Sequence, residues 1–255
     1  MRKSVLLTLL LLCTMSCFSR KAAQPVQVQP AFWWSGMVNP FLQLMLRAEG
    51  VGQSEVSIDA TDIQIDSIFR PTNTNYLFIY LNVAKAGPGQ FTIELRNNGK
   101  KQRISYELRQ RNQAVKAQGF DASDVLYLLM PDRFANGNPA NDVVKGLKEQ
   151  TAGQEPDARH GGDLEGMTAA LDYLADLGVT TIWPTPLQVN DMPSHSYHGY
   201  AITDYYEIDP RYGGNEAYRQ FVEQAHNKGL KVVQDMVFNH CGSENFLFTD
   251  RPDDS

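Results

Sequence analysis

The sequence predicts a multidomain β plus α/β protein, in which an antiparallel β-sandwich precedes a parallel sheet with alternating helices. From about residue 31 to 110, short runs of alternating apolar and polar residues are separated by Gly, Pro, Asn and Asp, as in small antiparallel sandwiches. From residue 124 onward, apolar strands alternate with helical periods, the order that produces a parallel sheet. We therefore expect a sandwich domain over residues 24–115 and a second domain over residues 124–255, with polar linker residues over 111–123.

The clearest element of the first region is a β-hairpin. Apolar residues occupy every second position on both sides of the turn sequence Asn97-Asn98-Gly99-Lys100. An Asn-Gly pair between two such runs is a strong hairpin signal, because both central positions of the turn need positive φ. Further strands are expected over 42–46, 56–58, 63–65 and 76–83.

In the second region we expect three strands, over residues 125–130, 180–183 and 231–237. The first is a continuous apolar run, typical of a strand that is buried on both faces. Helical periods predict helices over 167–177 and 218–225, which end at Gly178 and Gly229. Long insertions follow the first two strands, at the carboxyl ends where parallel α/β folds place their sites.

The extreme N-terminus has the pattern of a secretory signal, expected over residues 1–23. Arg2 and Lys3 precede an apolar run that is followed by small residues. We expect an exported, periplasmic protein; the alternative is a lipid anchor at Cys17, although Thr14 stands where lipoprotein signals usually have Leu. Cys241 is the only cysteine outside this region, which excludes a disulfide framework.

The charge and hydropathy of the chain exclude two classes of partner. A net charge of −6 over 255 residues argues against a nucleic-acid partner. No segment is long and apolar enough to predict a transmembrane helix.

Three segments carry residues suited to chemistry. Residues 136–142 place four amide or carboxylate side chains within seven residues, as a hard cation such as calcium requires; the alternative is a turn cluster that binds nothing. Residues 197–206 are rich in Tyr, which suits sugar binding or ordinary packing. Residues 235–240 end an apolar strand with Asp, Asn and His, and His240 would be either a ligand contact or a core histidine.

These segments together resemble the α-amylase family of glycoside hydrolases (family 13), in particular its neopullulanase/cyclomaltodextrinase branch. The resemblance rests on Asn-Gly-Asn-Pro-Ala-Asn-Asp with the later Gly161-Gly162-Asp163, on His-Gly-Tyr followed by Asp-Tyr-Tyr, and on Asp-Met-Val-Phe-Asn-His. Phe32-Trp33-Trp34-Ser35-Gly36-Met37 resembles the N-terminal domain of cyclomaltodextrinase-like enzymes.

The resemblance implies a role for each matching residue. Tyr200 would form a platform for the sugar, His198 and His240 would contact it, and Asp235 would support the site. Asn239 would ligate a second calcium ion. The first calcium ion would be held by the carbonyl oxygen of Gly161 and by the side chains of Asn136, Asn138, Asn141, Asp142 and Asp163.

The resemblance also implies that residues 124–255 form the first three strands of an incomplete (β/α)8 TIM barrel, a fold that needs eight strands and roughly 250 residues. The family's nucleophile, acid/base and third carboxylate would lie beyond Ser255. We therefore expect an inactive fragment of a retaining α-glucan hydrolase acting on maltodextrin, cyclodextrin or pullulan, whose full-length parent would dimerise through the N-terminal domain. The alternative is a non-catalytic protein whose sandwich binds a glycan or another subunit.

Overall fold

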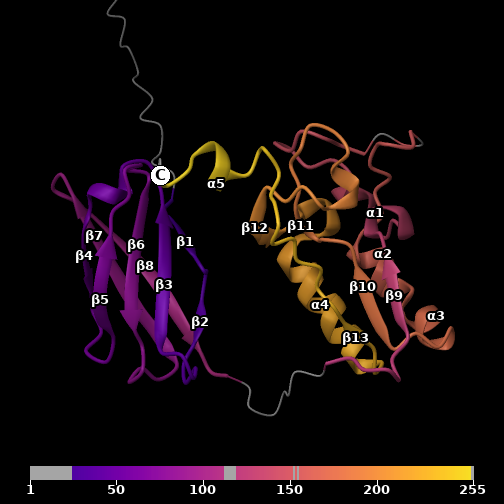
Figure 1. The fold of residues 1–255 in the computed structure, drawn as a ribbon, viewed down its shortest axis with the longest axis horizontal. Coiled ribbons are helices and arrows are strands. Elements are labelled where there is room, and N and C mark those ends of the chain that lie inside the picture. The colour runs from indigo at the N-terminus through magenta and orange to yellow at the C-terminus, as the bar shows by residue number, and fades with distance from the viewer. Residues whose placement is uncertain (1–24, 112–118, 152, 154, 254–255) are drawn as a thin grey trace, which may run out of the picture.

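The computed structural model describes residues 25–111, 119–151, 153 and 155–253 (Figure 1). The expected signal, including Cys17, and most of the expected linker lie outside these residues. Within the described part of the chain, no helix is long and apolar enough to cross a membrane.

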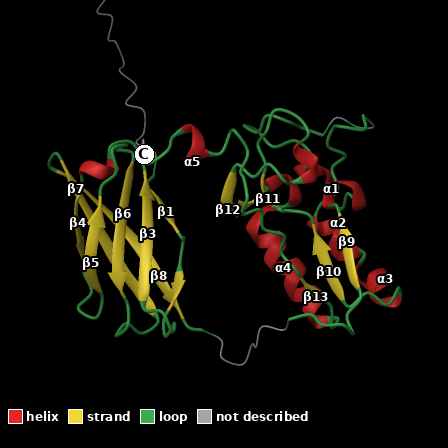
Figure 2. Ribbon diagram, in the orientation of Figure 1, coloured by secondary structure: helices red, strands yellow, loops and turns green. Residues whose placement is uncertain are grey.

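The first region consists of two four-stranded sheets (Figure 2). One has the order β1 (Gln27–Gln29), β3 (Phe41–Arg47), β6 (Tyr76–Asn82), β5 (Gln64–Phe69), and all its pairings are antiparallel. The other has the order β2 (Trp33–Trp34), β8 (Lys100–Arg109), β7 (Gly89–Asn97), β4 (Glu55–Ile58). Here β2 pairs parallel with β8, a departure from the purely antiparallel sandwich that the alternation predicts. A 3-10 turn, η1 (Val51–Gln53), precedes β4.

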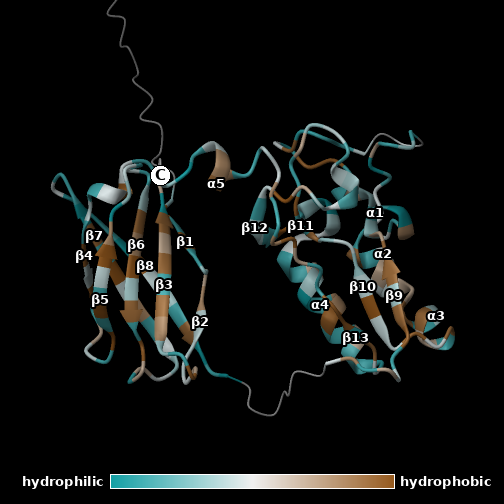
Figure 3. Cartoon of the chain, viewed as in Figure 1, coloured by the Kyte–Doolittle hydropathy of each residue, from teal (hydrophilic) through white to brown (hydrophobic). Residues whose placement is uncertain are grey.

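A single apolar core joins the two sheets. Alternate residues of each central strand point into it, and Figure 3 shows apolar residues in brown along β3 and β6. Burying one such side chain stabilises the fold by about 1.5–3 kcal/mol, so the period-2 pattern fixes which face of each strand lies inward. The inward residues of β3, β6, β7 and β8 are Leu42, Leu44, Leu46, Leu77, Ile79, Leu81, Phe91, Ile93, Leu95, Tyr106 and Leu108.

The predicted hairpin is confirmed. Asn97 of β7 pairs with Lys100 of β8, and the two residues between them have φ angles of 47° and 74°. Both angles lie in the left-handed region, which Asn98 and Gly99 tolerate better than other residues.

The second region contains a three-stranded parallel sheet in the order β13 (Lys231–Val232), β10 (Thr181–Pro184), β9 (Leu126–Leu129). Four helices, α1 (Pro131–Phe134), α2 (Leu164–Ala169), α3 (Leu171–Asp176) and α4 (Gly214–Asn227), accompany it. The insertion after β10 carries an antiparallel pair, β11 (Gln188–Val189) and β12 (Asp204–Ile208). Short turns η2 (Pro139–Asn141), η3 (Ser196–His198) and η4 (Pro210–Tyr212) and a last helix, α5 (Phe246–Thr249), complete it.

Two element predictions are wrong in detail. The single helix expected over 167–177 is divided at Ala170, where the N–H bonds back to the Met167 carbonyl in a tighter turn and φ and ψ are −93° and 3°. Gly178, at φ 89°, does follow its end. The third strand, expected over 231–237, pairs only at Lys231 and Val232, because its neighbour β10 ends at Pro184, which has no N–H for the ladder.

The expectation that the first strand is buried on both faces is also wrong. Leu129 is 5% exposed and packs with Ile182 against α2, α3 and α4, whereas Leu126 is 37% and Leu128 56% exposed. The helices of the described chain therefore cover one face of β9 and leave Leu126 and Leu128, on its opposite face, in contact with solvent.

One carboxylate ties the amino ends of the three parallel strands. Asp124 accepts a hydrogen bond from Lys231 Nζ at 2.8 Å and from Thr180 Oγ1 at 2.8 Å. The Lys231 ammonium, followed by the Asp121 backbone and Thr180, lowers the pKa of Asp124 to about 2.

We expect Asp124→Asn to lower the free energy of unfolding at neutral pH. Because the folded pKa lies below the unfolded value of about 3.9, this stabilisation is present above that value and is lost as pH falls through about 2. Urea unfolding followed by circular dichroism should show the difference between the wild type and Asp124→Asn shrinking as pH falls below about 4. Asp157→Asn, on an exposed loop, is the control; a difference that stays constant with pH would contradict the assignment.

Candidate sugar and cation sites

Tyr200 and Asp235 meet at the carboxyl end of the parallel sheet. The Tyr200 hydroxyl donates to Asp235 Oδ2 at 3.1 Å, and Trp183 Nε1 donates to the same oxygen at 3.2 Å. Trp183 belongs to β10, and Asp235 follows β13. Two donors from different segments therefore fix the carboxylate, and the carboxylate fixes the orientation of the tyrosine.

Two histidines flank Tyr200. The Tyr200 N–H donates to His198 Nδ1 at 2.9 Å, and the two rings are stacked with centroids 6.0 Å apart. His240 Nε2 lies 3.1 Å from the Tyr200 carbonyl oxygen. The structure thus brings all four predicted sugar-site residues together, and Tyr200 remains 37% exposed, so that its ring is open to a ligand.

Gly199 makes this arrangement sterically feasible. Its φ is 83°, and a Cβ atom at this position would lie 2.2 Å from the Pro186 carbonyl oxygen. Any other residue would push the loop away from the segment that follows β10, and Tyr200 would move with it.

Burial sets the protonation states at this site. Burial, then the neighbouring His195, lowers the pKa of His198, so its ring is neutral and Nδ1 accepts the Tyr200 N–H. Burial, then the hydrogen bond to Asp235, raises the pKa of Tyr200, so its hydroxyl stays a donor at neutral pH.

The predicted second-calcium residue, Asn239, lies beside the sugar-site histidine. Its side chain is exposed, and Nδ2 is 3.4 Å from His240 Nδ1. This contact places it at the edge of the sugar site.

Asp163 organises the predicted cation loop. It is fully buried, and its Oδ1 accepts from the backbone N–H groups of Gly137 at 3.0 Å and Gly166 at 2.7 Å. Its Oδ2 accepts from the Asn138 N–H at 2.9 Å and from Asn141 Nδ2 at 3.1 Å. The same carboxylate caps the start of α2 and closes the loop over 136–142 onto it.

Of the other predicted ligands, three converge and Asn138 points elsewhere. Asn136 Nδ2 donates to Asp142 Oδ1 at 2.9 Å, and a Cβ atom on Gly161 would lie within 2.7 Å of both side chains, so these three residues converge. Asn138 instead turns its side chain to the Ala140 N–H at 3.1 Å and to Glu165 at 2.7 Å.

The donor set of this loop fits an oxygen-seeking cation. Asn141 Oδ1 is buried without a hydrogen-bond partner, which is costly for an amide oxygen unless another group satisfies it. Among the described residues there is no group of three or more His, Cys, Asp or Glu placed to hold a metal. Amide, carboxylate and carbonyl oxygens are the ligands that calcium takes.

Two buried ion pairs hold the insertions that carry the sugar site. Arg211 and Asp209, both at most 2% exposed, form a bidentate pair with N–O distances of 2.6 and 2.9 Å. Arg211 also donates to the Glu149 and Asn190 carbonyls. Arg159 lies 3.7 Å from Asp132 and donates to Ser196 Oγ at 3.2 Å, two residues before His198.

Sequence reasoning assigned no role to these ion pairs, to Trp183 or to Tyr205. The Tyr205 hydroxyl donates to the carbonyls of Val237 at 3.0 Å and His240 at 2.8 Å, and so joins the two sugar-site segments. Trp183 reads as one more apolar residue in a strand. The sequence Asp209-Pro210-Arg211, which places an acid and a base two positions apart, was the only sequence signal for the bidentate pair.

We expect the pKa of His198 to lie below its unperturbed value of about 6.5. A group whose folded pKa is lowered in this way favours the folded state above the unfolded pKa, and this contribution is lost as pH falls through the folded pKa. An NMR titration of the His198 ring would measure it. A His198 pKa above about 6.5 would contradict the burial argument.

Comparisons with known proteins match both regions of the chain to protein families. Residues 27–112 match the family model for the cyclomaltodextrinase N-terminal domain, and residues 128–254 match that for the alpha amylase catalytic domain. Among curated proteins, a cyclomaltodextrinase of Thermoanaerobacter pseudethanolicus is 42% identical over 49% of this chain and 21% of its own length. Neopullulanase 2 of Thermoactinomyces vulgaris is 41% identical over the same shares.

The matched segment spans about a fifth of the length of these relatives. Among solved structures, an Anoxybacillus alpha-amylase is 38% identical over 50% of this chain and 26% of its own, with a TM-score of 0.46. On its two family matches, the chain belongs to the α-amylase family of glycoside hydrolases, with a cyclomaltodextrinase-type N-terminal domain.

Proposed function

We propose that this chain is part of a retaining α-glucan hydrolase that cleaves α-glucosidic bonds of maltodextrin, cyclodextrin or pullulan. The observation that carries this proposal is the convergence of Tyr200, His198 and His240 around Asp235 at the carboxyl end of a parallel sheet. The names of the curated relatives, cyclomaltodextrinase and neopullulanase, support the substrate class. In this proposal the sheet of β9, β10 and β13 is the first part of a (β/α)8 TIM barrel.

The chain's own residues would bind and orient the sugar. The exposed ring of Tyr200 offers a flat apolar surface to one face of a pyranose, and the hydrogen bond to Asp235 keeps that ring in place. His240, whose Nε2 points to the Tyr200 carbonyl, lies where it would meet a sugar hydroxyl at the edge of the ring.

Bond cleavage needs groups that we propose lie outside these 255 residues. A retaining glycosidase uses a nucleophile and an acid/base carboxyl about 5 Å apart. Asp235 is not proposed for either role, because its Oδ2 already accepts from Trp183 and Tyr200 and serves to fix the tyrosine. The chain alone should therefore bind oligosaccharide without hydrolysing it.

Titration of the 255-residue chain with maltoheptaose should show binding that Tyr200→Ala weakens by about tenfold, the equivalent of ~1.4 kcal/mol. Tyr200→Phe keeps the ring and should retain most of the affinity, and Tyr173→Ala on α3 is the control for loss of an exposed tyrosine. A reducing-sugar assay should detect no turnover.

Two outcomes would contradict the proposal in different ways. Turnover that Asp235→Asn abolishes would make Asp235 a catalytic residue. If Tyr200→Ala leaves binding unchanged, the glycan does not bind at Tyr200. This result would favour the sandwich as a non-catalytic binding domain.

We further propose that the 136–163 loop binds calcium. Asn136, Asn141 and Asp142 would supply side-chain oxygens and Gly161 its carbonyl, with Asp163 as the carboxylate beneath them. Calcium bound there would neutralise the two carboxylates and stiffen the insertion that lies between β9 and α2.

Calorimetric titration with calcium chloride should give a binding heat, and Asp142→Ala should weaken the affinity by at least about tenfold because one of two carboxylates is lost. Asp142→Ala is preferable to Asp163→Ala, which would also remove four hydrogen bonds from the loop. Asp157→Ala, exposed in the same insertion, is the matched control. A folded chain that gives no heat with calcium would remove the site.

A further inference from the structure

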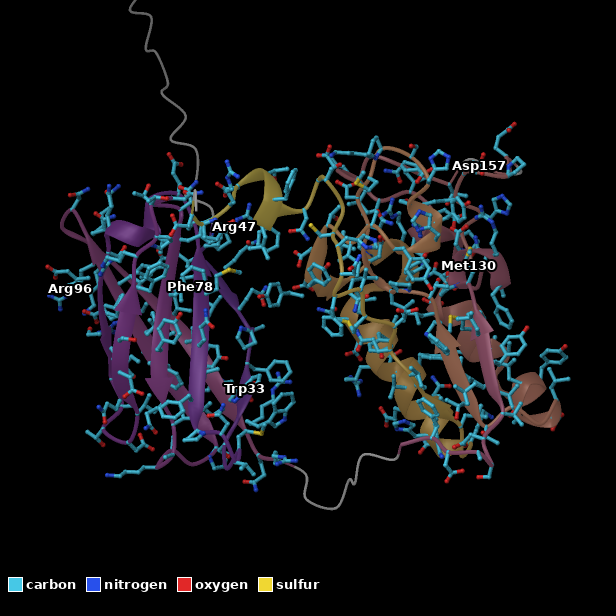
Figure 4. The ribbon with its side chains drawn as sticks, in the orientation of Figure 1. Trp33, Arg47, Phe78, Arg96, Met130 and Asp157 are labelled. Carbon is cyan, nitrogen blue, oxygen red and sulfur yellow. The ribbon has the colours of Figure 1, made fainter. Side chains whose placement is uncertain are left out.

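Residues 246–253, here called the strap, leave the second domain and contact the sandwich. In Figure 1 its helix, α5, lies between the two regions, and Figure 4 shows Arg47 of β3 on the side of the sandwich that faces it. These contacts join residues that are more than 170 positions apart in the sequence.

Asp250 is the centre of the contact. Its Oδ1 accepts from Asn73 Nδ2 at 2.8 Å and from Asn75 Nδ2 at 3.5 Å, and its Oδ2 lies 3.5 Å from Arg47 Nε. The Arg47 guanidinium also lies 4.4 Å above the ring of Phe246. One carboxylate thus meets two amides and one cation, all presented by the sandwich.

The backbone of the strap is held as well as its side chains. Asn73 donates through Nδ2 to the Arg251 carbonyl at 3.0 Å and through its own N–H to the Pro252 carbonyl at 3.1 Å. Thr72 Oγ1 donates to Asp253 Oδ1 at 3.1 Å. Because Asn73 bonds to three consecutive strap residues, it fixes the path of the strap and does more than neutralise a charge.

The residues that precede the strap are anchored beside the sugar site. Asn245, which is fully buried, donates through Nδ2 to the Ile202 carbonyl at 3.1 Å, and the Gly242 N–H donates to the same carbonyl at 2.9 Å. A Cβ atom on Gly242 would lie 2.6 Å from the Ala201 carbonyl, so the two segments touch. Ile202 is two residues from Tyr200, and Gly242 is two residues from His240.

A single helical turn connects the two anchors. Asn245 accepts the Leu247 N–H through Oδ1 at 2.8 Å, and its carbonyl accepts the Thr249 N–H at 2.9 Å. The Asp250 N–H donates to the Phe246 carbonyl at 2.9 Å. A hydrogen-bonded turn transmits displacement from Asp250 to Asn245 better than an unstructured segment of the same length would.

We propose that the sandwich positions the sugar site through the strap, with Asn73 and Arg47 as positioning residues that lie outside the site itself. That Tyr200 and His240 bind a sugar rests on the proposed function. The coupling of these two residues to the sandwich does not depend on any ligand. The N-terminal domain would then be required for the geometry of Tyr200 and His240, although within the described residues it makes no hydrogen bond or ion pair with either.

Hydrogen–deuterium exchange of the full 255-residue chain, without sugar, tests the proposal. Asn73→Ala should speed amide exchange roughly fivefold at Gly242 and Tyr200 as well as in the strap, since opening of a local unit exposes its amides together. The matched control is Asn39→Ala, which removes a hydrogen bond to Phe41 within the same sandwich. Amides of β6, β7 and α4 report whether each variant is folded.

Asp250→Ala is the second variant, and the double variant Asn73→Ala/Asp250→Ala should show less than the sum of the two single effects, because both act through one contact. Faster exchange in the strap with no change at Gly242 and Tyr200 would overturn the positioning role, as would unchanged exchange throughout. Maltoheptaose is added only after the exchange measurement. A failure to bind sugar would then contradict the proposed function without affecting the exchange result.

Discussion

The insertions that carry the sugar site depend on the buried pair between Arg211 and Asp209. These segments have little regular secondary structure, so side chains must satisfy the backbone groups that a helix or sheet would pair. Arg211 does this for the Glu149 and Asn190 carbonyls while both oxygens of Asp209 hold its guanidinium. Burying two charges is expensive, and removing either partner of such a pair typically costs about 3–5 kcal/mol, because the other is left buried and unpaired. The pair therefore specifies one arrangement of the loops, in which Glu149 in turn accepts the Ser196 N–H at 2.6 Å, upstream of His198.

The parts of the fold that were predicted correctly are those with a local physical cause. The Asn98-Gly99 turn needs positive φ at two residues, and the alternation in β3, β7 and β8 follows from a core on one side of each strand. The convergence of Tyr200, His198, His240 and Asp235 was also anticipated, but from family resemblance, since these residues are up to 42 positions apart. No periodicity would have paired them.

What could not be predicted depends on neighbours that the sequence does not identify locally. A run such as 125–130 is apolar throughout, so it gives no sign that Leu129 is covered by helices while Leu128 is exposed. The early end of β13 reflects Pro184 in another strand, not any residue of its own. The Asn73–Asp250 contact likewise joins two polar residues whose surrounding sequence gives no sign of a partner. Long-range pairings of this kind are specified by the three-dimensional arrangement and have no sequence period.

The cation loop shows how one carboxylate limits what its neighbours can do. The two oxygens of Asp163 offer about four lone pairs, and four N–H donors already point at them. Asp163 is thus satisfied by the protein alone, whereas Asn141 Oδ1 is not. A cation would be drawn first to the oxygens of Asn141 and Asp142, and would reach Asp163 only by displacing the Asn141 amide from it. Reversing that amide would turn its oxygen toward the carboxylate, an arrangement that is repulsive unless a positive charge lies between the two. If calcium binds as we propose, Asn141 should therefore change its orientation, whereas Asp163 should keep its position.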